Sequence, residues 1–244
     1  MTELLDATGR TLLLTGAAGG IGSNILNAYH RAGGTIVAAD LNIDAIPDDS
    51  RIVRVKCDVS SAADIAHLVA SARAPSGRID DVVHCAGIVG SGTLADTAVE
   101  AWEKVMDVNL TSAFLLAKSV FPMLAEARGN LILFSSTNGR NGGSALSGAA
   151  YACSKAAIIG LNRYLAKEWA GSGIRVNCIA PGPVDTPMLD RLDQKTMDAL
   201  GSALLTDNIP DADEIAAMAC FLLSKHARSM TGTVINQSGG LVLD

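Results

Sequence analysis

The chain has 244 residues, of which 49% are hydrophobic and 18% are charged, and this excludes a disordered chain, which is poor in apolar residues and rich in charge. The net charge is −6 and Lys and Arg form no cluster, so nucleic acid is not expected as a partner. No run approaches the roughly 18 apolar residues that span a bilayer, and the start MTELLDATGR does not resemble a secretory signal.

Seven short apolar runs alternate with longer segments of helical spacing. Because the runs are apolar on both faces, they predict a parallel sheet covered by helices on both sides, in a single doubly wound α/β domain over residues 1–244. The predicted strands are Thr11–Thr15, Thr35–Asp40, Arg51–Val59, Asp80–Ala86, Asn130–Ser135, Ile174–Ile179 and Gly232–Asn236. The predicted helices are Ile21–Ala32, Ala62–Ala74, Trp102–Ala127, Tyr151–Ala170 and Asp213–Leu223, and Gly139–Gly148 is predicted to be a loop.

The first predicted strand runs directly into a glycine-rich turn and then a helix. Glycine lets the backbone turn sharply and approach a ligand closely, and the helix N-terminus offers free N–H groups to a phosphate. The turn therefore predicts a dinucleotide site, although an ordinary turn with tight helix–strand packing would have the same pattern. The residues expected to contact the cofactor here are Gly16, Ala18, Gly20, Ile21 and Gly22.

An acidic residue, Asp40, ends the second predicted strand, 18 residues after Gly22. In dinucleotide folds an acid at this place accepts hydrogen bonds from ribose hydroxyls, and its charge would repel a 2′-phosphate. Leu41 follows, so no basic residue is available to attract that phosphate, and NAD is favoured over NADP. An Asp that only caps the next turn is the alternative. Asp58 and Val59, which end the third predicted strand, are expected to meet the adenine.

Tyr151 and Lys155 are four residues apart in a predicted helix, so they share one face. A neighbouring ammonium would stabilise a phenolate and lower the tyrosine pKa from its usual value of about 10. The phenol could then exchange a proton with an alcohol or a ketone while hydride moves to or from a nicotinamide. By itself this spacing is common, and a solvated helical pair is the alternative.

Other motifs accompany the Tyr151–Lys155 spacing, in a fixed order along the chain. With them the chain resembles the short-chain dehydrogenase/reductase family, in its short single-domain branch, over nearly its whole length. The motifs are TGAAGGIG at 15–22, Asp58, CAG at 85–87, Asn109, the serine pair at 135–136, Tyr151 with Lys155, and PGPVDT at 181–186. The resemblance implies a Rossmann-type domain that transfers hydride between a nicotinamide dinucleotide and a substrate.

The resemblance also implies roles for single residues. Tyr151 would be the catalytic acid/base, and Lys155 would be its pKa partner and a ligand of the nicotinamide ribose. Ser136 would hold the substrate oxygen. Asn109 would support a water relay to the lysine, although an asparagine that bonds backbone at a helix kink is the alternative.

Further cofactor contacts are implied at Cys85, Ala86 and Gly87, whose backbone would pass close to the dinucleotide. Thr186 would bond the nicotinamide carboxamide with help from the backbone around Val184, and an ordinary turn hydroxyl is the alternative for this threonine. No Cys or His spacing predicts a metal site. The five cysteines are odd in number and scattered, so a cytoplasmic protein with reduced thiols is expected.

Two departures from the family pattern leave questions open. His84 stands where the family usually has Asn, and a satisfied core histidine that replaces the strand-tying hydrogen bond is expected there. Ser136 lies 15 residues before Tyr151, two more than is common, and the usual spacing would fall on Asn138. Ser136 is preferred because it follows a strand, and Ser135 is the second candidate.

A substrate lid is expected at about residues 186–210. The apolar residues of Met188–Leu205 have roughly helical spacing, so they predict either a helix packed on the core or a partly apolar pocket. Asp190, Arg191, Asp193 and Lys195 are expected to form the wet face of this segment. Small and apolar residues in the helices Trp102–Ala127 and Tyr151–Ala170 predict a homodimer or homotetramer, because the resemblance implies a subunit interface there.

These observations predict an NAD-dependent oxidoreductase that interconverts a secondary alcohol and a ketone, with Tyr151 as the acid/base. An NADPH-dependent ketoacyl or carbonyl reductase is the enzymatic alternative. A dinucleotide-binding scaffold without catalysis is the other. The substrate itself cannot be read from the sequence.

Overall fold

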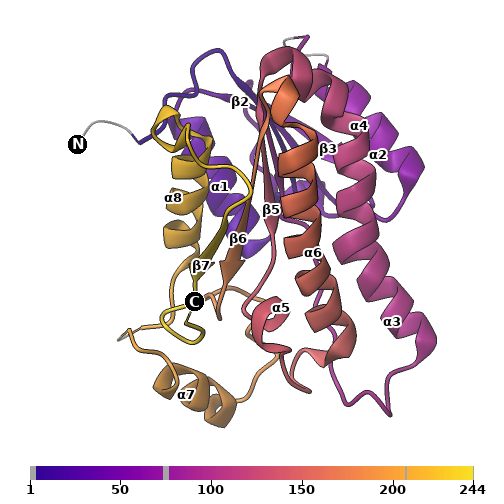
Figure 1. The fold of residues 1–244 in the computed structure, drawn as a ribbon, viewed down its shortest axis with the longest axis vertical. Helices are drawn as coiled ribbons and strands as arrows, with labels where there is room; N and C mark the ends of the chain where they lie inside the picture. The colour runs from indigo at the N-terminus through magenta and orange to yellow at the C-terminus, as the bar shows by residue number, and fades with distance from the viewer. Residues whose placement is uncertain (1–3, 74–76, 207, 244) are drawn as a thin grey trace.

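The computed structural model describes residues 4–73, 77–206 and 208–243, and its described strands form one seven-stranded parallel sheet (Figure 1). The strand order is β3-β2-β1-β4-β5-β6-β7, so the crossovers proceed in one direction from β1 and in the other from β4. Such a reversal opens a crevice at the carboxyl ends of the central strands, where open α/β sheets bind ligands. The predicted α/β fold class is confirmed.

The elements alternate along the chain as the sequence pattern indicated. The strands are β1 (Thr11–Thr15), β2 (Thr35–Asp40), β3 (Ile52–Lys56), β4 (Asp81–His84), β5 (Asn130–Phe134), β6 (Arg175–Pro181) and β7 (Val234–Gln237). The helices are α1 (Gly20–Arg31), α2 (Ala62–Arg73), α3 (Val99–Met106), α4 (Ser112–Ala127), α5 (Asn138–Asn141), α6 (Gly148–Glu168), α7 (Gln194–Ser202) and α8 (Ala212–Leu223). A π-helical turn, Asp107–Thr111, joins α3 to α4.

The core lies on both faces of the sheet. Leu12 and Leu14 of β1 pack with residues of α1 and α8 on one face, whereas Leu13 packs with residues of α2, α4 and α6 on the other. Figure 1 shows the same division, with α1 and α8 on one side of the sheet and α4 and α6 on the other. This alternation follows from the opposite directions of successive strand side chains. It explains why the strands are apolar along their whole length.

Two strands are shorter than the sequence predicted. The run Arg51–Val59 forms only the five-residue β3, and Asp80–Ala86 forms only the four-residue β4. In both cases the last predicted residues lie beyond the end of the strand and line the cavity described below. Other strand ends differ from the prediction by no more than two residues.

The helix predictions need two larger corrections. The predicted loop Gly139–Gly148 contains most of α5, and α6 begins at Gly148, three residues before Tyr151. The helical run predicted from Trp102 begins at Val99 and is interrupted by the π-helical turn. The glycine content hid the short helix, because periodicity over four residues carries little signal. Ala74, the predicted end of the second helix, lies outside the described residues.

One described helical run, Val99–Ala127, is long and apolar enough to cross a bilayer by length and composition alone. A helix buried in a protein core meets the same criterion, and 44% of its most apolar window is buried inside this structure. Its α4 portion supplies Leu116, Val120 and Leu124 to the core. Packing against the sheet therefore accounts for part of its apolar character.

Candidate active site

A cavity of about 1290 Å³ lies at the carboxyl edge of the sheet. It is lined by the turn after β1, the residues after β2, β3, β4 and β5, the start of α6 and the segment after β6. Every predicted site residue except Asn109 lines it, and the lining set is Gly16, Ala18, Gly20, Ile21, Gly22, Asp40, Leu41, Asp58, Val59, Cys85, Ala86, Gly87, Ser136, Tyr151, Lys155, Val184 and Thr186. Residues up to 170 positions apart in the sequence therefore meet at one place.

The glycine turn has no room for side chains at its critical positions. Gly16 has φ +69°, and a Cβ there would lie 2.7 Å from the Ala86 nitrogen. A Cβ on Gly22 would lie 2.0 Å from the Gly16 carbonyl oxygen, and one on Gly20 would lie 2.5 Å from Thr186 Cγ2. Tight packing therefore accounts for Gly16 and Gly22. No side chain caps the N-terminus of α1, so its first N–H groups stay available to an anion in the cavity.

Asp40 connects the second strand to this turn. Its Oδ2 accepts a hydrogen bond from the Ala18 N–H at 3.0 Å, and its Oδ1 accepts one from the Asn42 N–H at 3.0 Å. The turn-capping alternative is thus present in the structure. A carboxylate oxygen can accept more than one hydrogen bond, so both oxygens keep capacity for a ribose hydroxyl. Leu41 beside it is 63% exposed at the rim of the cavity.

Asp58 and Cys85 lie in the cavity wall with their polar groups already engaged or protonated. Asp58 Oδ1 accepts hydrogen bonds from the Ser60 N–H at 2.9 Å and from its hydroxyl at 2.6 Å, which fixes the turn that follows β3. Burial raises the pKa of the Cys85 thiol to about 12, so the thiol is protonated at neutral pH. A Cβ on Gly87 would lie 3.2 Å from Asn109 Oδ1 and 3.4 Å from Lys155 Nζ. A larger residue at this position would press on both groups.

Ser136, Tyr151 and Lys155 form the polar centre of the cavity. Lys155 Nζ lies 5.6 Å from the centroid of the Tyr151 ring and donates a hydrogen bond to the Phe134 carbonyl at 2.9 Å. The Ser136 hydroxyl is a hydrogen-bond partner of the Tyr151 hydroxyl. The other candidate serine, Ser135, donates its hydroxyl to the Lys155 carbonyl at 2.7 Å and so anchors α6. This geometry favours Ser136 as the residue that meets a substrate.

The protein groups alone do not lower the pKa of Tyr151 as the Tyr–Lys spacing predicted. Burial raises this pKa, and the hydrogen bond from Ser136 and the charge of Arg191 only oppose the rise. Burial also lowers the pKa of Lys155, because a desolvated ammonium is disfavoured. Desolvation therefore dominates both groups, and the phenol of Tyr151 is held in its neutral form.

Asn109 lies behind the cavity wall and is 1% exposed. Its Oδ1 accepts a hydrogen bond from the Ile88 N–H at 2.9 Å, and its Nδ2 donates to the Ile88 carbonyl at 2.9 Å and to Ser154 Oγ at 3.1 Å. The alternative of an asparagine that bonds backbone at a helix kink is confirmed, since the residue sits in the π-helical turn. Its part in a water relay to Lys155 stays a prediction.

His84 is a satisfied core histidine, as expected. One ring nitrogen lies 2.8 Å from the Thr15 hydroxyl on the neighbouring strand β1, and the other lies 2.9 Å from the Ser112 hydroxyl on α4. Burial and the charge of Lys155 lower the pKa of His84 to about 3, so the ring is neutral. The imidazole thus supplies the tie between strands that the missing asparagine would give.

The segment after β6 forms one wall of the cavity. Thr186 donates its hydroxyl to the Val184 carbonyl at 3.1 Å, which is the turn-hydroxyl arrangement weighed as the alternative for this residue. Beyond it, the apolar residues of the predicted lid divide. Those that line the cavity are Met188, Leu189, Leu192 and Leu200, whereas Met197, Leu204 and Leu205 do not. The predicted apolar pocket is therefore made by Met188, Leu189 and Leu192 in the first part of the segment, together with Leu200 of α7.

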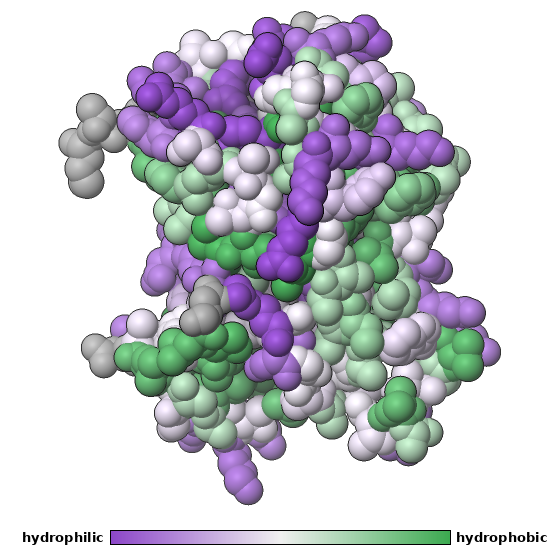
Figure 2. All heavy atoms as spheres, in the orientation of Figure 1, coloured by the Kyte–Doolittle hydropathy of each residue, from purple (hydrophilic) through white to green (hydrophobic). Residues whose placement is uncertain are grey.

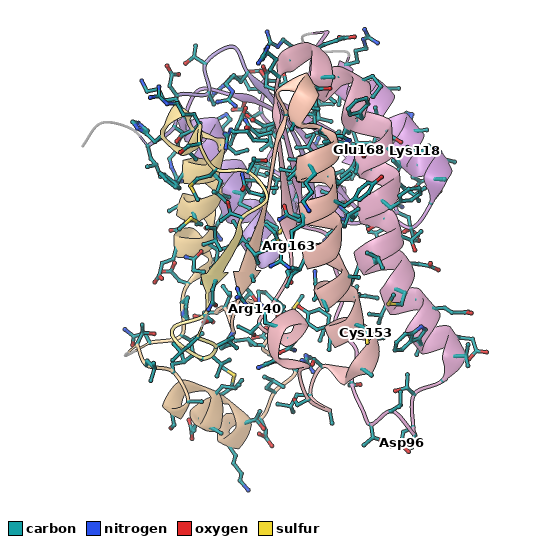
Figure 3. All side chains as sticks on the ribbon, in the orientation of Figure 1. Asp96, Lys118, Arg140, Cys153, Arg163 and Glu168 are labelled. Atoms are coloured by element: carbon teal, nitrogen blue, oxygen red, sulfur yellow. The ribbon has the colours of Figure 1, made fainter. Side chains whose placement is uncertain are left out.

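Arg191 is the functional candidate that the sequence did not reveal. It was expected on the wet face of the lid and it is exposed, but it also lines the cavity and donates from Nη1 to the Leu146 carbonyl at 2.7 Å. The contact joins the lid to the loop between α5 and α6, two segments with no fixed spacing in the sequence. Arg140 on α5 and Cys153 on α6 mark in Figure 3 the two helices that flank this loop. Only the fold could bring the two segments together.

Known proteins match the chain over nearly its whole length. The family model described as "Enoyl-(Acyl carrier protein) reductase" matches residues 16–242. The chain is 34% identical to the 3-oxoacyl-[acyl-carrier-protein] reductase FabG of Thermotoga maritima, over 96% of this chain and 98% of that protein. It is 31% identical to the 2-dehydro-3-deoxy-L-rhamnonate dehydrogenase (NAD(+)) of a Sphingomonas strain, over 95% of each.

Solved structures agree with the sequence matches. The crystal structure of the "Short-chain dehydrogenase/reductase SDR:Glucose/ribitol dehydrogenase" from Brucella melitensis superposes with a TM-score of 0.93 at 32% identity, covering 98% of this chain and 99% of that one. The 3-oxoacyl-[acyl-carrier protein] reductase from the same species superposes with a TM-score of 0.90 at 29% identity, covering 100% of this chain and 97% of that one.

Proposed function

This chain belongs to the short-chain dehydrogenase/reductase family, an NAD(P)-dependent group that acts on CH–OH groups, and we propose that it interconverts a secondary alcohol and a ketone with NAD. The observation that carries the proposal is the meeting of Ser136, Tyr151 and Lys155 in one cavity with the glycine turn. A dinucleotide-binding scaffold without catalysis would not need these three groups together.

The residues present fit a nicotinamide dinucleotide. Gly20 packs closely against Thr186, so the turn after β1 and the segment after β6 meet in the cavity, and the uncapped start of α1 presents N–H groups to a pyrophosphate. Asp40 would hold the adenosine ribose, Lys155 the nicotinamide ribose, and Thr186 the carboxamide. When bound, the dinucleotide supplies the hydride acceptor or donor.

The proposal of NAD over NADP rests on charge. Asp40 would lie against a 2′-phosphate and repel it. The next residue in the cavity lining, Leu41, carries no positive charge that could offset this repulsion. The likeness to FabG supports the alternative, an NADPH-dependent ketoacyl or carbonyl reductase. The likeness to a dehydrogenase whose name specifies NAD(+) supports the proposal.

The proton chemistry follows from burial. Because the pKa of Tyr151 is raised, its neutral phenol is ready to donate a proton to a ketone oxygen held by Ser136. In the oxidative direction the same oxygen must accept the alcohol proton, which requires stabilisation of the phenolate. Lys155, whose Nζ lies 5.6 Å from the centroid of the Tyr151 ring, and Arg191, whose charge lowers the Tyr151 pKa, would provide it.

We also propose that the protein is a homodimer or homotetramer. Phe114 on α4 is 52% exposed and Tyr164 on α6 is 62% exposed. Figure 2 shows white and green residues over much of the area where α4 and α6 face the viewer, crossed by purple residues, and Figure 3 labels the charged Lys118, Arg163 and Glu168 on these two helices. Sedimentation at micromolar concentration tests this, and a monomer would contradict it.

The test of the function is a panel of polyols, sugars, steroids and hydroxy acids, each with NAD and NADP, followed at the nicotinamide absorbance. We expect turnover of at least one secondary alcohol, with a higher kcat/KM for NAD. A higher value for NADP would support the reductase alternative. If no alcohol or ketone reacted while NAD still bound, the scaffold alternative would hold.

A further inference from the structure

The part of the cavity formed by residues from Phe134 onward differs in charge from the rest. Among its described lining residues only Lys155 and Arg191 are charged, and both are cations. The cavity's acidic residues come from other segments, namely Asp40, Asp58 and the α3 region, where Glu100, Glu103 and Asp107 outnumber the one cation, Lys104. An anionic group of a substrate would therefore be attracted to the segment that carries Arg191 and repelled by the others.

The backbone fixes Arg191 near the proposed nicotinamide site. Two successive turns follow Thr186, closed by hydrogen bonds from the Leu189 N–H to the Thr186 carbonyl at 2.9 Å and from the Leu192 N–H to the Leu189 carbonyl at 2.8 Å. These turns fold the segment back on itself. Arg191 thus stays within reach of the cavity that Tyr151 occupies, and its charge acts on the Tyr151 hydroxyl.

The guanidinium of Arg191 has more N–H donors than its hydrogen bond to the described residues uses. Its Nη1 bonds the Leu146 carbonyl, and among the described residues no carboxylate pairs with it. Arginine has five N–H donors in a planar fork, so several remain after this bond. The Leu146 contact holds the guanidinium at the cavity lining and leaves the other donors free for a planar anion.

We propose that Arg191 binds the carboxylate of the substrate, so that the enzyme acts on a hydroxy acid and its keto acid. This rests on the proposed oxidoreductase function. The two oxygens of a carboxylate match the two parallel N–H donors of the guanidinium fork. Met188, Leu189 and Leu192 beside it would cover the carbon chain of the acid. In oxidation the carbinol carbon would give a hydride to the nicotinamide, and the hydroxyl on that carbon would give its proton to the phenolate form of Tyr151, leaving the keto acid.

The first experiment compares matched acids and esters. The probes are 2- and 3-hydroxy acids of four to eight carbons and their methyl esters, assayed with NAD in the wild type, in Arg191→Gln and in the control Lys195→Gln, an exposed residue of α7 outside the cavity lining. We expect Arg191→Gln to lower kcat/KM for the best acid roughly 10- to 100-fold, the range for loss of a hydrogen bond between charged groups. The esters and the control should change little.

Arg191 could instead only hold the lid against Leu146. In that case Arg191→Gln would lower kcat/KM for acids and esters by the same factor, and the proposal would be overturned. Arg191→Lys adds a second check, because it keeps the charge and loses the planar fork. We expect it to recover only part of the preference for the acid.

A binding measurement separates this proposal from the proposed function. Calorimetry with the straight-chain carboxylates from propionate to octanoate, and with their amides, needs no turnover. Tighter binding of a carboxylate than of its amide, lost in Arg191→Gln, would support the anion site even if no alcohol were oxidised, and only the oxidoreductase proposal would then fail. Equal binding of every acid and its amide would overturn the anion site.

Discussion

The cavity has a dinucleotide half, formed by the turn after β1 and the residues after β2, β3 and β4, and a substrate half, formed by the segment after β6 with α7. The two halves differ in how tightly they are packed. In the dinucleotide half, backbone packs against backbone, and Gly16 and Gly22 have no space for a Cβ. In the substrate half, the lid helix α7 buries none of its residues, and a Cβ on its Gly201 would meet nothing within 4 Å. The first half therefore tolerates almost no change of shape, whereas the second can vary its side chains freely. Substrate choice can change in such a fold while cofactor binding is kept.

The largest effect is expected at Tyr151, where the two halves meet. Tyr151→Phe removes the hydroxyl that exchanges the proton and leaves the ring that packs in the wall. We expect kcat to fall by roughly 10²- to 10⁴-fold, the usual contribution of general acid–base catalysis, with unchanged NAD binding by calorimetry. Lys195→Gln, at an exposed residue outside the cavity lining, is the control. Wild-type turnover in Tyr151→Phe would contradict the assignment.

A pair of glycine substitutions tests the comparison directly. In Gly22→Ala the new Cβ would lie 2.0 Å from the Gly16 carbonyl oxygen, so the turn must move. We expect the free energy of unfolding to fall by about 3 kcal/mol and NAD binding to be lost. In Gly201→Ala, alanine suits the helix better than glycine, so stability should be unchanged or rise by up to about 1 kcal/mol. Similar losses in both variants, measured by urea unfolding, would contradict the comparison.

His84 makes the dinucleotide half sensitive to acid. Its pKa is about 3 in the folded protein, against 6.5 for an ordinary histidine, so the unfolded chain binds a proton that the fold excludes. This contribution to stability is complete above about pH 6.5 and is lost as the pH falls below it. Between pH 7 and pH 5 we expect a loss of about 2 kcal/mol in the wild type. In His84→Asn the loss of unfolding free energy between pH 7 and pH 5, measured with urea, should be smaller than in the wild type by about 2 kcal/mol. An equal loss in both proteins would contradict a buried neutral imidazole at His84.

Asp40 should set the choice of dinucleotide. Asp40→Asn removes the negative charge that a 2′-phosphate would meet and keeps the size of the side chain. We expect the ratio of kcat/KM for NADP to that for NAD to rise roughly tenfold, because like charges in contact repel. Asp44→Asn, an exposed residue outside the cavity lining, is the control. An unchanged ratio would mean that Asp40 serves only to hold Ala18 and Asn42.

The smallest effect is expected in the lid. Asp193 caps α7 by accepting a hydrogen bond from the Thr196 N–H, and Asp211 caps α8 by accepting one from the Glu214 N–H. Each cap is worth about 1 kcal/mol to its helix. Because α8 supplies core residues and α7 does not, Asp211→Ala should lower global stability by that amount. Asp193→Ala should only speed hydrogen exchange in α7, and an equal loss of global stability would show that the lid belongs to the cooperative fold.

The difference between the halves also explains what the sequence could predict. The glycine turn, Asp40 and the Tyr151–Lys155 pair could be located because backbone geometry and helical spacing restrict residue type locally. Arg191 could not be located, because its contact with Leu146 depends on two irregular segments meeting in space. The predicted direction of the Tyr151 pKa shift was also wrong, because the spacing of Tyr151 and Lys155 does not show how strongly burial desolvates the phenol. One sequence therefore shows which residue types the local backbone requires, but it does not show which side chains the fold buries.

The π-helical turn at Asp107–Thr111 has a consequence for insertions and deletions. Each residue of an α-helix rotates the chain by about 100°, so removing one residue from the wide turn would swing α3 by that angle relative to α4. Glu103 and Lys104 would then leave the cavity wall, and Asn109 would lose its bonds to Ile88. The length of this stretch is therefore under tighter restraint than the identity of most of its side chains.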